Sequence, residues 1–188
     1  ERVRGLAQNA SAKAAFFSKE YQAGIDAWLL DGTILLRGIE VLPVAELLVP
    51  GDHNIANALG AVLACGLVGL EPEVIGKRLK TFTGIPGRQE LLGITTDEVR
   101  IINDTTSSTP TALYTALDTF REHDIYLICG GMNKQLNYDD FADKIAQSRV
   151  KEIFFLPGTA TEFMLNSLKQ SQYKGIVQEV RSVDQATQ

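Results

Sequence analysis

The segment Thr83-Gly84-Ile85-Pro86-Gly87 constrains the fold of this chain more than any other part of the sequence. Two glycines and a proline close together interrupt a helix or a strand, because glycine is flexible and proline lacks a backbone N–H. The hydrophobic pattern also differs on the two sides of this segment. A chain of 188 residues is long enough for two small domains. We therefore predict one domain over residues 1–83 and a second over residues 84–188, joined by a hinge.

The start of the first domain predicts paired β-strands. Ala27–Leu30 and Thr33–Arg37 are apolar runs separated by Asp31-Gly32. An Asp-Gly pair between two such runs is a strong signal for a β-hairpin. Residues 12–18 predict a further short strand, and Val41–Leu48 is a third apolar stretch. We therefore expect this region to be β-rich and built on a hairpin.

Two helices are predicted to follow these strands. The first runs from about His53 to Leu67 and ends before Gly69. Asp52 precedes it and is expected to be its N-cap, since a carboxylate there accepts hydrogen bonds from free N–H groups. The second helix begins with Pro72 in its first turn and runs to about Phe82.

Strands and helices alternate after the linker. This alternation predicts an α/β domain with a mostly parallel sheet, flanked by helices that form right-handed crossovers. A further helix is expected to begin near Val183. The expected strands are Val99–Asn103, Ile125–Cys129, Ile153–Leu156 and Ile176–Val180, and the expected helices are about Pro110–Glu122, Tyr138–Ser148 and Ala160–Gln170.

The composition argues against several classes of function. The formal net charge is −5 and the basic residues form no block, so nothing indicates binding to nucleic acid or to a membrane surface. No apolar run reaches the roughly 18 residues of a membrane span, and residues 1–8 lack the apolar core of a signal peptide. Cys65 and Cys129 lie far apart in apolar surroundings, which favours reduced core residues of a cytoplasmic protein. Two histidines and two cysteines so widely spaced predict no zinc site.

The motif His53-Asn54-Ile55-Ala56-Asn57 places three polar side chains at the start of a predicted helix. Asn57 follows His53 by one turn and so lies on nearly the same face. The amide of asparagine offers both a donor and an acceptor, which suits a nucleobase edge or a phosphate oxygen. Capping of the helix by the same side chains is the alternative interpretation.

Two further candidates surround the first predicted strand of the second domain. Arg88 lies directly after the linker, and arginine forms bidentate hydrogen bonds to phosphate oxygens. Asp104 follows the strand and precedes a run of Ser and Thr residues and a helix. In open α/β sheets ligands bind at such strand ends, and anionic groups favour such a helix start. The alternatives are a surface ion pair for Arg88 and a simple N-cap for Asp104.

The loop Gly130-Gly131-Met132-Asn133-Lys134 follows the next predicted strand. Two glycines allow the backbone to turn tightly and to approach a ligand closely. Lys134 would then present a positive charge at the same sheet edge as Asp104. The alternative is an exposed lysine in an ordinary strand–helix loop.

In this combination and order, the four motifs resemble the Mur ligase family. They are most similar to members that add D-glutamate to UDP-N-acetylmuramoyl-L-alanine in peptidoglycan synthesis. The resemblance implies that residues 1–83 are the C-terminal part of the central ATP-binding domain, a remnant with a β-hairpin and helices. Residues 84–188 are then most of a truncated, Rossmann-like C-terminal ligase domain. The implied activity is ATP-dependent amide formation through an acyl phosphate.

The resemblance also implies partners and roles for single residues. The implied partners of the full enzyme are ATP, Mg²⁺, D-glutamate and the UDP-linked muramoyl precursor, and the enzyme is expected to be a monomer. The Mg²⁺ ligands are expected to lie mostly outside this sequence, and the motifs suggest no catalytic residue. The implied nucleotide-binding residues are His53, Asn54, Asn57, Arg88 and Asp104, and the implied substrate-binding residues are Ser108 and Lys134.

The chain departs from the family pattern at several points. The common form Asn-Asp-Ser-Lys-Ala-Thr-Asn is replaced by Asn-Asp-Thr-Thr-Ser-Ser-Thr, so Thr106 stands where a lysine contacts phosphate. Ser108 replaces a threonine but keeps its hydroxyl, and Asn133 replaces an aspartate. The phosphate-binding loop is also missing, because Gly76-Lys77-Arg78 lacks the hydroxyl that follows the lysine. We therefore expect this chain alone to be inactive.

Two alternative functions remain open at this point. One is another Mur-type ligase, such as a tripeptide-forming or a folylpolyglutamate enzyme. The other is a non-catalytic module that binds a nucleotide.

Overall fold

The computed structural model describes residues 5, 7 and 11–187. The chain divides into two compact units, residues 1–85 and 86–188, and each is described by itself. The expectation about a signal peptide in residues 1–8 lies outside the described residues, apart from Gly5 and Ala7.

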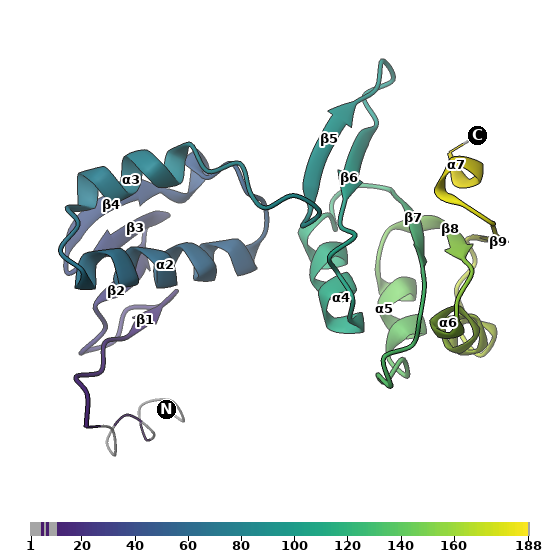
Figure 1. The fold of residues 1–188 in the computed structure, drawn as a ribbon, viewed down its shortest axis with the longest axis horizontal. Helices are drawn as coiled ribbons and strands as arrows, with labels where there is room; N and C mark the ends of the chain where they lie inside the picture. The colour runs from purple at the N-terminus through teal and green to yellow at the C-terminus, as the bar shows by residue number, and fades with distance from the viewer. Residues whose placement is uncertain (1–4, 6, 8–10, 188) are drawn as a thin grey trace. The chain divides into compact units, whose positions relative to one another are not determined.

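The first unit contains a four-stranded sheet with the order β1-β2-β3-β4 (Figure 1). The strand β1 is parallel to β2, and the other neighbours are antiparallel. Asp31 and Gly32 join β2 to β3 with φ angles of 48° and 76°, as a tight hairpin turn requires. The predicted hairpin is therefore confirmed. The strands are β1 (Phe17–Ser18), β2 (Ala27–Leu30), β3 (Thr33–Leu36) and β4 (Ile39–Pro43).

Three helical segments follow: η1 (Val44–Glu46), α2 (Asp52–Leu67) and α3 (Pro72–Lys80). Both predicted helices are confirmed, although α3 ends two residues before Phe82. The predicted N-cap of α2 is wrong. Gly51 occupies that position, and Asp52 is the first helical residue, with its carboxylate 3.0 Å from the ammonium of Lys19.

The core of the first unit lies between this sheet and the two long helices (Figure 1). Ile34 of β3 and Leu59 and Val62 of α2 are fully buried there. The helix α3 packs very closely on β4, because a Cβ added to Gly76 would lie 2.2 Å from the carbonyl oxygen of Val41. This close approach explains a glycine in the middle of a helix.

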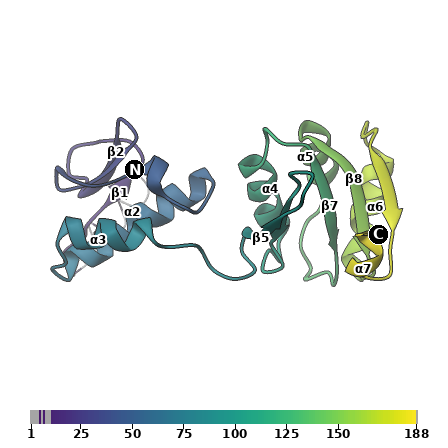
Figure 2. The ribbon, with the colours of Figure 1, turned by 90° about the horizontal axis from the view of Figure 1, so that it is seen from above.

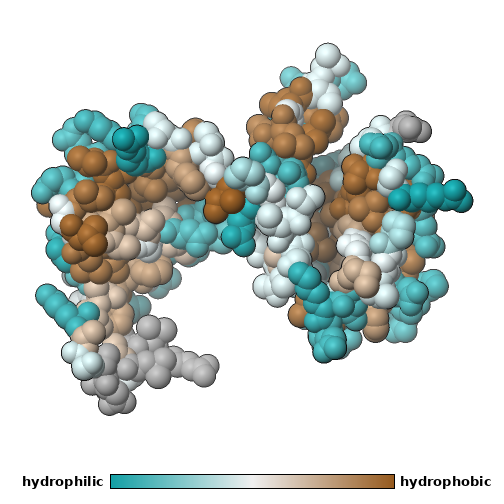
Figure 3. Space-filling model, in the orientation of Figure 1, coloured by the Kyte–Doolittle hydropathy of each residue, from teal (hydrophilic) through white to brown (hydrophobic). Residues whose placement is uncertain are grey.

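The second unit begins with an antiparallel hairpin of β5 (Glu90–Ile94) and β6 (Arg100–Asn103). The strand at β6 was predicted, but its expected place in the parallel sheet is wrong, and β5 was not predicted. The connection between them is short, and parallel strands need a crossover of a dozen or more residues. Figure 3 shows apolar side chains on this hairpin, where Leu92 is 60% exposed.

A three-stranded parallel sheet forms the centre of the second unit, with the order β7-β8-β9. The helices α4, α5 and α6 pack around β8 in one core that includes Leu117, Phe141 and Phe155 (Figure 2). The predicted parallel sheet with flanking helices is therefore confirmed. The strands are β7 (Ile125–Gly130), β8 (Val150–Leu156) and β9 (Ile176–Glu179), and the helices are α4 (Pro110–Thr119), α5 (Phe141–Gln147), α6 (Thr159–Lys169) and α7 (Val183–Ala186).

Within the described residues, no helix combines the length and the apolar character that crossing a membrane requires. Cys65 and Cys129 are both free thiols, as expected from their apolar surroundings.

Candidate functional site

The first candidate group lies at the N-terminus of α2. The side-chain nitrogen of Asn54 donates to the carbonyl oxygen of Pro50 at 2.6 Å, and its side-chain oxygen accepts from Asn57 at 3.2 Å. Both ends of the Asn54 amide are therefore engaged, but neither bond involves a free backbone N–H of α2, and the N-cap Gly51 has no side-chain cap, so these bonds are not those of a helix cap. Asn57 is exposed, and its own side-chain oxygen accepts no hydrogen bond from a described residue. A nucleotide contact from His53, Asn54 or Asn57 stays a prediction.

The second group joins the loop after the linker to the loop after β6. Asp104 accepts a hydrogen bond from the backbone N–H of Gln89 at 3.0 Å and one from the hydroxyl of Ser107 at 2.6 Å. The alternative that Asp104 caps α4 is wrong, because Thr109 is the N-cap and accepts from the N–H of Ala112 at 3.2 Å. The carboxylate of Asp104 instead holds two loops together.

Glu90 adds to the same connection. Its carboxylate accepts from the backbone N–H of Gly87 at 2.8 Å and from the side-chain amide of Asn103 at 3.1 Å. These bonds link the start of β5 to the end of β6. The backbone around Arg88 is therefore tied down on several sides.

The side chains of Arg88 and Ser108 project from this connected region. Both residues are exposed, and neither side chain forms a hydrogen bond or an ion pair with a described residue. The alternative interpretation was a surface ion pair, but the guanidinium of Arg88 has no acidic partner in the described part of the chain. The guanidinium is available to bind an anion.

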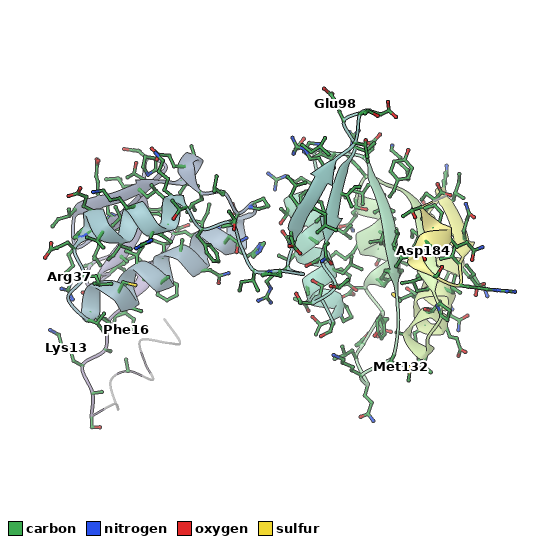
Figure 4. All side chains as sticks on the ribbon, turned by 45° about the horizontal axis from the view of Figure 1, so that its top comes forward. Lys13, Phe16, Arg37, Glu98, Met132 and Asp184 are labelled. Carbon is green, nitrogen blue, oxygen red and sulfur yellow. The ribbon has the colours of Figure 1, made fainter. Side chains whose placement is uncertain are left out.

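Lys134 lies in the loop that follows β7. The backbone N–H of Asn133 donates to the hydroxyl of Thr159 at 2.8 Å, and the side-chain oxygen of Asn133 accepts from the N–H of Leu136 at 3.1 Å. A carboxylate oxygen can accept in the same way, so asparagine preserves this role of the usual aspartate. Lys134 itself is exposed, and its ammonium has no partner among the described residues. Met132 in the same loop also projects outward (Figure 4).

The predicted common sheet edge of Asp104 and Lys134 is wrong. Asp104 follows β6, and β6 pairs with β5 rather than with the parallel sheet that contains β7. The structure does place Asp104 near the backbone of Arg88, because Asp104 accepts a hydrogen bond from the N–H of Gln89, the residue after Arg88. It also reveals two residues that the motifs did not single out. Gln89 joins two loops distant in sequence, and Thr159 joins the loop after β7 to the first residue of α6.

The cysteine at the end of β7 is not activated for nucleophilic attack. Burial raises the pKa of the Cys129 thiol to about 12, so this residue at the end of β7 stays a neutral thiol near pH 7. No three His, Cys, Asp or Glu side chains of the described residues are grouped so that they could hold a metal ion. The exposed cations of Arg88 and Lys134 suit phosphate and carboxylate groups.

Comparison with known proteins identifies the family. The chain is 38% identical over 141 residues to UDP-N-acetylmuramoylalanine–D-glutamate ligase from Streptococcus equi subsp. zooepidemicus, a match that covers 74% of the chain and 30% of that protein. It is 30% identical over 186 residues to the ligase of the same name from Latilactobacillus sakei, covering 99% of the chain and 39% of that protein. The chain belongs to the Mur ligase family.

Solved structures of Mur ligases share the fold. MurF from Acinetobacter baumannii matches with a TM-score of 0.65 and 17% identity, over 99% of this chain and 48% of that chain. The UDP-N-acetylmuramate-alanine ligase MurC from Thermotoga maritima matches with a TM-score of 0.60 and 19% identity, over 80% of this chain and 34% of that chain. No family model matches the chain. The present chain spans 30% of the length of the Streptococcus ligase and 39% of the length of the Latilactobacillus ligase.

Proposed function

We propose that this chain is part of an ATP-dependent ligase that adds D-glutamate to UDP-N-acetylmuramoyl-L-alanine during cytoplasmic peptidoglycan precursor synthesis. The names of the curated relatives support this substrate pair. In this proposal the first unit is the C-terminal part of a central ATP-binding domain. The second unit is most of a C-terminal, Rossmann-like ligase domain.

One observation supports binding roles for Arg88 and Lys134 in particular. Arg88 and Lys134 are exposed cations without partners among the described residues, yet each belongs to a loop whose backbone donates a hydrogen bond to a side chain distant in sequence. A fixed backbone reduces the conformational entropy that the loop loses when its side chain binds a charged ligand. This arrangement is typical of binding residues and differs from that of cations in surface ion pairs.

The proposed reaction has two steps. The γ-phosphoryl group of ATP passes to the carboxylate of the UDP-linked substrate, which gives an acyl phosphate and ADP. The amine of D-glutamate then attacks the acyl carbon, phosphate leaves, and the amine loses a proton as the amide forms.

The residues of this chain act in binding and orientation. Arg88 holds phosphate oxygens of ATP, and Asp104 accepts hydrogen bonds from the ribose hydroxyls. His53, Asn54 and Asn57 contribute further nucleotide contacts.

The amino-acid substrate is held separately. Lys134 binds a carboxylate of D-glutamate, and Ser108 donates a hydrogen bond to the same substrate. Correct orientation of the attacking amine lowers the barrier, because the entropy of bringing the groups together is lost before the reaction.

Mg²⁺ is implied by the family, but the described residues do not fit it. They include no group of three possible protein ligands, and we assign no Mg²⁺ ligand to this chain. Magnesium supplied from elsewhere in the enzyme would neutralise charge on the phosphates.

The test uses the complete reading frame that contains this chain, purified and incubated with ATP, Mg²⁺, the UDP-linked substrate and one amino acid at a time. We expect ADP release with D-glutamate and with the UDP-linked substrate present together. D-glutamate and L-glutamate have the same size and charge, so L-glutamate is the matched control and is expected to give none. Release with a different amino acid would indicate another Mur-type ligase. If no combination of acceptor substrates gives ADP release, the protein is a non-catalytic module. Either of these two outcomes overturns the proposal.

A further inference from the structure

Thr106 forms the closest connection between the two loops around Arg88. Its backbone N–H and its side-chain hydroxyl both donate to the carbonyl oxygen of Gly87, at 2.9 and 2.8 Å. Gly87 and Thr106 are 19 positions apart in the sequence. One carbonyl oxygen therefore accepts two hydrogen bonds from one distant residue, and Gly87 cannot rotate without breaking both.

Gly87 is suited to this close contact. It is buried and has a φ of 75°, a conformation that favours glycine. A Cβ added at this position would lie 3.0 Å from the methyl carbon of Thr106 and 3.2 Å from the hydroxyl oxygen of Thr105. The side chain of Thr106 therefore packs directly against the backbone of Gly87.

The residue on the other side of Arg88 is fixed as well. Gln89 is only 8% exposed, has a φ of 46°, and donates its backbone N–H to Asp104. Arg88 thus lies between two anchored residues, while its own side chain is exposed. The direction in which the guanidinium leaves the loop depends on these two anchors.

From this geometry we infer that Thr106 is a positioning residue for Arg88, acting through the carbonyl oxygen of Gly87. The inference rests on the proposed function for the role of Arg88 in binding ATP. It also gives a physical meaning to the departure from the family pattern. A lysine at position 106 keeps the backbone N–H bond but loses the hydroxyl bond, whereas threonine supplies both and carries no charge. The chain therefore uses this position to fix an arginine instead of presenting a second cation.

The experiment compares Thr106→Val with Thr106→Ser in the complete enzyme. Valine has nearly the shape of threonine but lacks the hydroxyl, and serine keeps it. Loss of one hydrogen bond of this kind is expected to raise the KM for ATP about three- to tenfold in the valine variant. The KM for D-glutamate and the thermal midpoint are expected to stay unchanged. The serine variant should behave like the wild type.

Two further measurements separate positioning from a merely structural role. In an Arg88→Ala background, Thr106→Val is expected to have no additional effect on the KM for ATP, because the side chain that it positions is absent. In the 188-residue chain, Thr106→Val should speed the hydrogen exchange of the Gln89 and Thr106 amides, and Thr106→Ser should not.

The outcomes are distinguishable. An equal effect of Thr106→Val with and without Arg88, or unchanged amide exchange, overturns this inference and leaves the proposed function standing. An Arg88→Ala enzyme with an unchanged KM for ATP overturns the proposed role of Arg88 and this inference with it.

Discussion

The backbone N–H of Asn133 donates to the hydroxyl of Thr159 at 2.8 Å, which ties the loop after β7 to the first residue of α6. These two residues are 26 positions apart. The bond also fixes the residue immediately before Lys134. The first turn of α6 therefore sets the position of the loop from which Lys134 projects.

We predict that Thr159→Val in the complete enzyme weakens the use of D-glutamate. Thr159 is exposed, so the substitution should not disturb the core, but it removes the acceptor for Asn133. Loss of this bond should raise the KM for D-glutamate about three- to tenfold with little change in the KM for ATP. Thr159→Ser is the matched control, because it keeps the acceptor oxygen. A valine variant with wild-type kinetics would mean that the loop needs no support from α6.

We predict that the 188-residue chain alone forms no amide. Gly76-Lys77-Arg78 lies within α3, and the ammonium of Lys77 is 2.7 Å from the carboxylate of Glu73, so this segment does not act as a phosphate-binding loop. The measurement is ADP release in the presence of ATP, Mg²⁺, D-glutamate and the UDP-linked substrate. Release that depends on both acceptor substrates would contradict this prediction.

We predict opposite tolerances for two helical glycines of the first unit. A Cβ at position 76 meets the backbone oxygen of Val41 at 2.2 Å, whereas a Cβ at position 60 meets only the end of the Phe17 ring at 3.3 Å. Alanine normally favours a helix by about 1 kcal/mol relative to glycine. Overpacking should nevertheless make Gly76→Ala less stable by about 1–3 kcal/mol, while Gly60→Ala changes little.

Urea unfolding followed by the fluorescence of the single tryptophan, Trp28 in β2, measures this difference in the first unit. Equal free energies of unfolding for the two alanine variants would contradict the observed packing of α3 on β4.

We predict a pH-dependent contribution of Asp124 to the stability of the second unit. The hydrogen bond from Arg149 lowers the pKa of Asp124 below its ordinary value of 3.8, with help from the charges of Arg149 and Lys151 and against a smaller effect of desolvation. A carboxylate with a lowered folded pKa stabilises the fold above the unfolded pKa, and this contribution is lost as the pH falls through the folded pKa.

Asp124→Asn should therefore be slightly less stable than the wild type near neutral pH, and the two should converge below the ordinary value of 3.8. Thermal unfolding across this range measures the difference, and Arg149→Gln should show the same trend. A difference between Asp124→Asn and the wild type that is constant with pH would show that the ion pair is not its cause.

Much of the fold follows from local patterns in the sequence. Asp31-Gly32 predicts the β2–β3 hairpin because this pair readily adopts positive φ angles, and both residues do so. The apolar runs at β7 and β8 predict strands of the parallel sheet. β8 is the central strand and has three buried residues, whereas β7 is half-buried at the edge of the three-stranded sheet. The helices between them follow from the spacing of their apolar residues.

Other features depend on contacts between distant residues. The strand β5 is mostly exposed, with Gly93 in its middle, so it lacks the alternation that marks a half-buried strand. The role of Asp104 was open because an acid before a helix suggests a cap, whereas the structure bonds it to Gln89, 15 positions earlier. The hydrogen bonds of Thr106 and Thr159 also join residues distant in sequence, so no local pattern predicts them.

We propose that Arg88 and Lys134 bind different substrates of one ligase. Once a ligand buries such a cation, removal of the charge should cost about 2–5 kcal/mol, because the ligand charge is left unpaired. In the complete enzyme, Arg88→Ala should therefore mainly weaken the use of ATP, and Lys134→Ala should mainly weaken the use of D-glutamate.

Steady-state kinetics with each substrate varied in turn distinguish the two roles. Arg121→Ala is the control, because this exposed arginine pairs with the neighbouring Glu122. We expect a raised KM for ATP in Arg88→Ala, a raised KM for D-glutamate in Lys134→Ala, and wild-type values in Arg121→Ala. Small and equal effects on both substrates in both alanine variants of the site would contradict this proposal.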